Sequence, residues 1–123
     1  MTKELGVGIL GLGGIGLTHA RALREIAPDV RLQAFSGGDA ERAGEAGWPD
    51  AVQVAPEELV RSPGVDVVAV CSPSAEHASH AMSAMAAGRH VVVEKPLALT
   101  AADADRVVAL AAEHGVVAAV ISQ

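Results

Sequence analysis

The chain has one cysteine, no tyrosine, and only one tryptophan and one phenylalanine among its 123 residues. The single cysteine, Cys71, excludes an internal disulfide and a thiolate metal cluster, which is typical of a protein in a reducing cytoplasm. Half of the residues are hydrophobic although aromatics make up only 2%. The core must therefore be filled by Val, Leu, Ile and Ala, as in sheets that helices cover on both faces.

An excess of basic residues and long apolar runs are also missing. Nine Lys and Arg residues stand against fifteen Asp and Glu, which gives a net charge of −6 and no basic stripe for nucleic acid. No run of about 18 uncharged apolar residues occurs, and no basic segment precedes an apolar one at the N-terminus. We therefore expect a soluble, cytoplasmic protein with no nucleic-acid or membrane partner.

The length and the apolar pattern predict one α/β domain over residues 1–123. The first predicted helix, 16–27, places Gly16, Ala20 and Leu23 on one face and ends before Pro28. A helix of about two turns is expected after Asp39, and longer helices over 75–87 and 101–114, the last with Thr100 as its N-cap. The predicted strands are 5–10, 30–35, 51–54, 65–70, 90–93 and 116–121. This alternation predicts a doubly wound parallel sheet of about six strands in a three-layer domain, with its ligand above the carboxyl ends of the strands.

The segment Gly11-Leu12-Gly13-Gly14-Ile15-Gly16 joins the first predicted strand to the first predicted helix. In a nucleotide-binding turn, Gly11 permits the tight bend, Gly13 lets the backbone approach a pyrophosphate, and Gly16 lets the helix pack closely on its strand. The helix N-terminus at Gly14 and Ile15 offers N–H groups and the positive end of the dipole to phosphates. The pattern predicts a dinucleotide site, and a purely structural turn is the alternative.

Cofactor choice depends on the end of the second strand, where NAD sites usually place an acidic residue for the ribose hydroxyls. Ser36 and Gly37 occupy that place, so no carboxylate there repels a 2′-phosphate, and Arg42 on the next helix could reach one. This favours NADP. Asp39 lies close enough to keep NAD open, and it is equally a candidate N-cap for the short helix, with Arg42 then a surface charge.

Two further motifs follow later strands. They are Cys71-Ser72-Pro73-Ser74-x-x-His77 and Gly88-Arg89-His90-Val91-Val92-Val93-Glu94-Lys95-Pro96. With the glycine turn and Gly16-x-x-His19, they resemble the N-terminal Rossmann-type domain of the glucose-fructose oxidoreductase and inositol dehydrogenase family, Gfo/Idh/MocA. Members of that family are nicotinamide-dependent oxidoreductases that act mostly on sugars, cyclitols and related hydroxy compounds.

The resemblance implies that residues 1–123 form the NAD(P)-binding domain, without the family's larger C-terminal α/β domain. That second domain carries the substrate pocket and a histidine acid/base. We therefore expect this chain to bind dinucleotide with little or no turnover. A non-enzymatic module that binds or senses the dinucleotide is the alternative. We expect the surface that a second domain would cover to be apolar, and such a patch favours a homo-oligomer.

Lys95 is the predicted catalytic residue, because the resemblance places it and Glu94 in a Glu-Lys-Pro motif beside the nicotinamide. An ammonium group can donate a hydrogen bond to a substrate oxygen that gains negative charge as hydride arrives. The alternative is a solvated ion pair between Glu94 and Lys95 at the strand end.

The loop after the fourth strand matches the family loop that passes along the cofactor, so contacts are expected from Cys71, Ser72, Pro73, Ser74 and His77. Ser74 is also a candidate helix N-cap. Cys71 is expected to be a buried, inert thiol. The three-residue spacing of His77 and His80 permits a metal in principle, but no further ligand is identifiable and no metal is predicted. The other histidines, His19, His90 and His114, are expected to be packing or surface residues.

Overall fold

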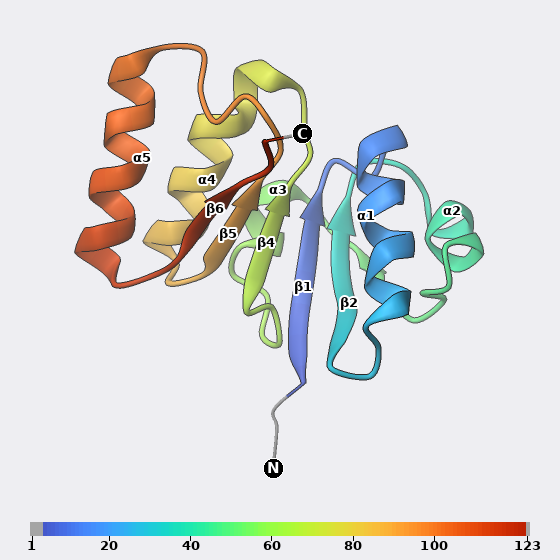
Figure 1. Ribbon diagram of the computed structural model, residues 1–123. Coiled ribbons are helices and arrows are strands. Elements are labelled where there is room, and N and C mark those ends of the chain that lie inside the picture. Colours follow the sequence, from blue (N-terminus) through green and yellow to red (C-terminus); the bar gives the residue numbers. More distant parts are fainter. Residues whose placement is uncertain (1–3, 123) are drawn as a thin grey trace.

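The computed structural model describes residues 4–122, in which six parallel strands alternate with helices. The strands are β1 (Leu5–Leu10), β2 (Val30–Ser36), β3 (Val52–Gln53), β4 (Val67–Val70), β5 (His90–Val93) and β6 (Ala118–Val120). The helices are α1 (Gly14–Glu25), α2 (Ala40–Glu45), α3 (Pro56–Leu59), α4 (His77–Ala86) and α5 (Ala101–His114), and a 3₁₀ turn, η1 (Ser74–Glu76), leads into α4. The strand order is β3-β2-β1-β4-β5-β6 (Figure 1), which confirms the predicted doubly wound sheet.

Capping residues and other local sequence signals determine where most of the helices and strands begin and end. Asp39 caps α2, because its Oδ1 accepts a hydrogen bond from the Arg42 N–H at 2.8 Å. Thr100 caps α5 in the same way, through the Asp103 N–H at 3.1 Å. The prediction that Ser74 caps a helix is wrong, since Ser74 lies inside η1 and the N-cap of α4 is Glu76, without a side-chain cap bond.

Three predicted strands are longer than the observed ones. β4 begins at Val67, because Val65 is fully buried but its N–H bonds the Ser62 carbonyl in a turn. β3 and β6 lie at the two edges of the sheet and comprise two and three residues. Each pairs with one neighbour only: β3 with Ala34 and Phe35 of β2, and β6 with the stretch 91–93 of β5.

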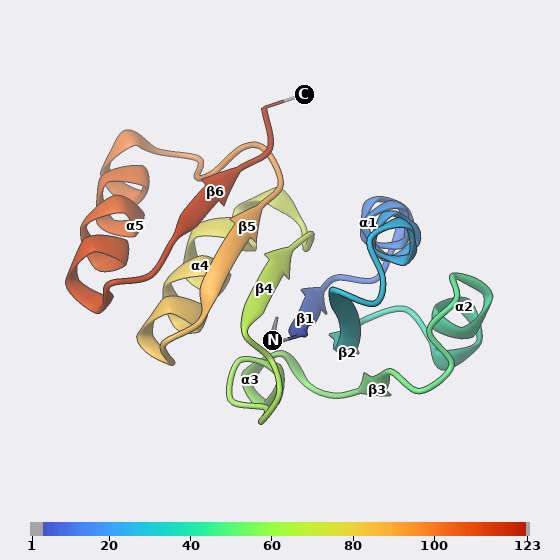
Figure 2. The ribbon, with the colours of Figure 1, turned by 60° about the horizontal axis from the view of Figure 1, so that its bottom comes forward.

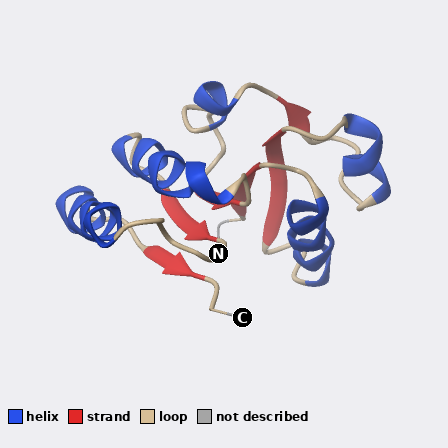
Figure 3. Cartoon of the chain, turned by 90° about the horizontal axis from the view of Figure 1, so that it is seen from above, coloured by secondary structure: helices blue, strands red, loops and turns tan. Residues whose placement is uncertain are grey.

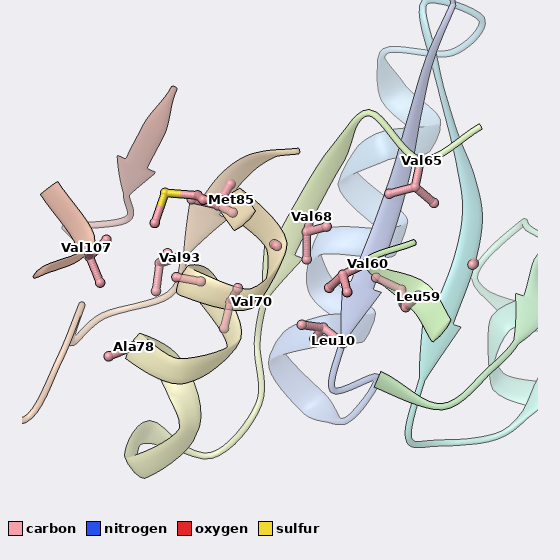
Figure 4. Close-up of a cluster of buried hydrophobic side chains, with 14 residues drawn as sticks. Leu10, Leu59, Val60, Val65, Val68, Val70, Ala78, Met85, Val93 and Val107 are labelled. Carbon is pink, nitrogen blue, oxygen red and sulfur yellow. The ribbon is translucent and has the colours of Figure 1, made fainter. Parts of the chain in front are cut away.

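The two faces of the sheet carry separate cores, because side chains alternate along each strand. Val7 and Ile9 of β1 face α1 and α2, whereas Leu10 faces the opposite side. There α3, α4 and α5 cover the sheet (Figures 3 and 4). Aliphatic residues dominate both cores, as the composition predicts, and the two aromatics, Phe35 and Trp48, lie in the α1 and α2 layer.

The position of β1 creates the site for a ligand. From β1 the chain builds outward through β2 to β3, and then returns by way of α3 to place β4 on the other side of β1 (Figure 2). The loops after β1 and β4 therefore leave the same edge of the sheet in opposite directions, which is where open α/β sheets bind ligands. In the described part of the chain, no helix has the length and apolar character to cross a membrane.

Candidate functional site

The glycine turn has the geometry that its spacing predicts. Gly11 has a φ of 94°, and a Cβ there would lie 2.8 Å from the Cys71 carbonyl group. A Cβ on Gly16 would lie 2.2 Å from the Gly11 carbonyl oxygen, so α1 packs on the turn only because residue 16 is glycine. A Cβ on Gly13 would meet nothing within 4 Å, and Gly13 adds no side-chain cap to α1. The turn thus presents an open backbone surface at a helix N-terminus, which suits an anion.

Two adjoining hollows lie over this turn and the loop after β4. The first, of about 350 Å³, extends over the glycine turn to Gly37 and Gly38. The second, of about 290 Å³, extends to Glu94 and Lys95. Both are lined by Ile15, Cys71, Ser72 and Pro73, so together they form a trough along the carboxyl edge of the sheet. A larger hollow of about 420 Å³ beside Arg24 and Trp48 does not touch the glycine turn.

The trough brings together most of the predicted site residues. They are Gly11, Gly13, Gly14, Ile15, Gly37, Cys71, Ser72, Pro73, Ser74, His77, Glu94 and Lys95. Gly16, Ser36 and Arg42 do not line it. Ser36 is 4% exposed, and its carbonyl oxygen accepts hydrogen bonds from the N–H groups of Gly11 and Leu12, both at 3.0 Å. Ser36 therefore holds the glycine turn in place through its backbone carbonyl.

The end of β2 carries two opposite charges. Asp39 and Arg42 are both exposed, and Arg42 Nε lies 3.8 Å from Asp39 Oδ2. The same carboxylate caps α2 through its other oxygen. Neither side chain lines the trough, which ends at Gly37 and Gly38 on this side.

Glu94 pairs with a histidine that the sequence analysis assigned to packing or the surface. Glu94 Oε2 lies 2.7 Å from His19 Nε2 on α1, and both side chains are partly buried. Glu94 therefore pairs with His19 and does not form the solvated ion pair with Lys95 that was the alternative. The position of His19, one turn after Gly16, was the signal that could have found it, because that turn of α1 faces the strand ends. Lys95 is exposed and lines the second hollow.

Cys71 has the inert environment that we predicted for it. Burial raises the pKa of its thiol to about 12, and the nearby Glu94 carboxylate contributes in the same direction. The group is therefore a neutral thiol at physiological pH and a poor nucleophile.

The His77 ring is 2% exposed, and both of its nitrogens face backbone oxygens. Nε2 lies 2.6 Å from the Ser72 carbonyl oxygen, and Nδ1 lies 2.7 Å from the Pro96 carbonyl oxygen. His80 Nδ1 lies 2.7 Å from Ser72 Oγ. The expected polar contact between His77 and a cofactor therefore has no free ring nitrogen to make it. Within residues 4–122, no three His, Cys, Asp or Glu side chains are grouped to hold a metal ion.

A parallel sheet with a glycine turn and a trough at its switch point defines a nucleotide-binding α/β domain. The chain belongs to the Gfo/Idh/MocA family, described as an oxidoreductase family with an NAD-binding Rossmann fold, which matches residues 5–122. It is an NAD-binding Rossmann domain of that family.

Relatives with stated activities match this same region. The chain is 39% identical over 113 residues to inositol 2-dehydrogenase of Agrobacterium fabrum, covering 89% of this chain and 34% of that protein. Identity to myo-inositol 2-dehydrogenase of Thermotoga maritima is 39% over 105 residues, covering 83% of this chain and 31% of that protein. GenD2 from gentamicin A biosynthesis, solved in complex with NAD, superposes with a TM-score of 0.84 at 35% identity, covering 98% of this chain and 35% of that chain. The chain thus spans about a third of the length of these relatives.

Proposed function

We propose that this chain supplies the dinucleotide site of an oxidoreductase that acts on a hydroxyl group of a sugar, cyclitol or related compound. The observation that carries the proposal is the trough, because it joins the open glycine turn to Lys95 across the switch point. Relatives named inositol 2-dehydrogenases support the substrate class.

In this proposal, the pyrophosphate lies against the Gly13 backbone and the N-terminus of α1, where N–H groups and the helix dipole favour negative charge. The loop from Cys71 to Ser74 lies along the rest of the dinucleotide. When bound, the nicotinamide supplies hydride exchange. Lys95 is the catalytic residue, since its ammonium group can donate a hydrogen bond to the substrate oxygen whose charge changes during that exchange. Glu94, held by His19, fixes the strand end before Lys95.

For the cofactor, we propose a preference for NADP over NAD. The carboxylate that would bind ribose hydroxyls is missing at Ser36 and Gly37, and Arg42 offers an exposed guanidinium on α2, the helix that follows Gly37 and Gly38 at that end of the trough. Because GenD2 was solved in complex with NAD, NAD is the competing cofactor whose affinity must be compared with that of NADP.

We further propose that these 123 residues alone bind dinucleotide but turn over little, because an exposed Lys95 on an open sheet edge lacks a water-excluding pocket. We also propose a location in the reducing cytoplasm, because the single cysteine of the chain is an inert thiol. The test joins this chain to the remaining two thirds of the Agrobacterium fabrum relative and assays dinucleotide reduction with inositol. Activity that Lys95→Met abolishes supports the proposal. A folded fusion that binds dinucleotide without turnover favours the sensing module instead.

A further inference from the structure

Two histidines one turn apart on α4 hold the loop that follows β4. His77 contacts the Ser72 carbonyl oxygen and His80 contacts the Ser72 hydroxyl, at 2.6 and 2.7 Å. The helix that carries them is anchored in the core by Ala78, Ala81, Ala84 and Met85. Since Ser72 lines both hollows, α4 determines where their shared wall lies.

His77 also reaches the far side of the site. Its Nδ1 lies 2.7 Å from the carbonyl oxygen of Pro96, the residue after Lys95. One imidazole thus joins the segment after β4 to the segment after β5, just beyond the last paired residues of those strands, Val70 and Val93. Figure 1 shows these two segments leaving the same end of the sheet beside α4.

The chemistry of the two partners fixes what the ring must do. Both are carbonyl oxygens, which only accept hydrogen bonds. A neutral imidazole carries one ring N–H and can donate to one of them, whereas a doubly protonated ring donates to both. Because the ring is 2% exposed, water does not offer an easy replacement for a missing partner. The two short distances place the ring as a bridge between the two carbonyls, with at least one of them accepting a hydrogen bond from it.

We propose that His77 is a positioning residue for Lys95. By lying between the Ser72 and Pro96 carbonyls and contacting both, it fixes the separation of the two segments and therefore the place of Lys95 over the second hollow. His77 acts through the backbone of its neighbours. This inference rests on the proposed function, because it gives His77 a role at the Lys95 site.

The sequence allows Lys95 to be observed directly, since Lys3 and Lys95 are the only lysines. In a Lys3→Arg background, reductive methylation with ¹³C-formaldehyde labels Lys95 and the terminal amine alone. We would record the Lys95 methyl resonance with and without NADPH in this background and with His77→Gln, His80→Gln or His114→Gln added. His114 is exposed at the end of α5 and serves as the matched control.

The proposal predicts that His77→Gln moves or broadens the Lys95 resonance in the ligand-free chain and removes its shift on NADPH addition. His80→Gln and His114→Gln should leave the ligand-free Lys95 resonance in place. An unchanged Lys95 resonance in folded His77→Gln overturns the proposal. If that variant does not fold, His77→Asn takes its place, because the shorter amide cannot reach both carbonyls: a displaced Lys95 resonance supports the positioning role, and an unchanged one refutes it.

This experiment distinguishes a failure of the proposed dinucleotide site from a failure of the proposed positioning role of His77. If NADPH does not bind the wild-type chain, the proposed dinucleotide site is wrong, whereas the ligand-free comparison still tests whether His77 positions Lys95. If NADPH binds and shifts Lys95 equally with and without His77, the site stands and the positioning role is wrong.

Discussion

A Cβ atom on Gly16 would lie 2.2 Å from the carbonyl oxygen of Gly11. The contact joins the first turn of α1 to the end of β1, and both atoms belong to backbone that cannot move far. We predict that Gly16→Ala lowers the free energy of unfolding by about 1–3 kcal/mol, the usual cost of forcing an extra methyl group into a packed site. Urea denaturation followed by the single tryptophan measures it.

Gly44→Ala is the matched control for that substitution. Gly44 lies in α2, and a Cβ there would meet nothing within 4 Å. Because alanine is the better helix former, the change should be neutral or add up to about 1 kcal/mol. Equal stability of the Gly16→Ala and Gly44→Ala variants would show that the close approach at Gly16 is relieved at no cost.

Cys71 should resist alkylation. With its pKa raised to about 12 by burial, the folded thiol is almost entirely protonated at pH 8, whereas the unfolded thiol has its ordinary pKa of about 8.5. Iodoacetamide should therefore react at least about tenfold more slowly with the folded chain than with the urea-unfolded chain. Equal rates would mean that Cys71 is a reactive thiolate.

The same shift gives a pH dependence with a definite sign. Between about pH 9 and 12 the folded chain keeps the Cys71 proton and the unfolded chain loses it, so the free energy of unfolding falls as pH rises. In Cys71→Ala this contribution disappears. Denaturation from pH 8 to 10.5 should therefore show a shallower decline for the variant than for the wild type, and parallel declines would contradict the assignment.

Asp39 should influence cofactor choice separately from helix capping. Asp39→Asn keeps an N-cap oxygen but removes the negative charge beside Arg42, so NADPH binding should improve several-fold relative to NADH. Asp39→Ala should in addition lose about 1 kcal/mol of stability with the cap. Calorimetric titration with both dinucleotides measures the ratio, and an unchanged ratio in Asp39→Asn would mean that the charge lies outside the ligand's reach.

The isolated chain should self-associate through an apolar face. A hollow of about 190 Å³ on the α1 side of the sheet is lined by apolar residues of β1, β2, β4 and β5, together with Leu23 and His19 of α1. Exposed apolar surface of this kind favours association. Sedimentation equilibrium should show a dimer at micromolar concentration, and a monomer throughout that range would contradict the prediction.

The sequence was most informative where the signal is local. The bounds of β1, β5 and α5 and the caps at Asp39 and Thr100 follow from apolar runs, hydrogen-bonding side chains and glycines within a few residues. The spacing of Gly11, Gly13 and Gly16 likewise predicted one turn, in which Gly11 and Gly16 have no room for a Cβ and Gly13 leaves its backbone open.

Contacts between distant segments were not predictable in the same way. His19 meets Glu94 across 75 positions, and His77 meets Pro96 across 19. Neither partner can be identified before the strand order is known. The prediction for Ser74 failed in the same region, because Ser74 lies inside the 3₁₀ turn η1, which His77 and Ser72 span through their own contact.

The most direct test of the account is a calorimetric titration of the purified chain with NADPH and with NADH, in the wild type and in Gly13→Val. A Cβ at Gly13 would meet nothing within 4 Å, so the variant should keep the fold while blocking the approach of a pyrophosphate. The account predicts binding by the wild type, tighter for NADPH, and its loss in folded Gly13→Val. Equal binding by both chains, or no binding of either dinucleotide to the wild type at millimolar concentration, would contradict it.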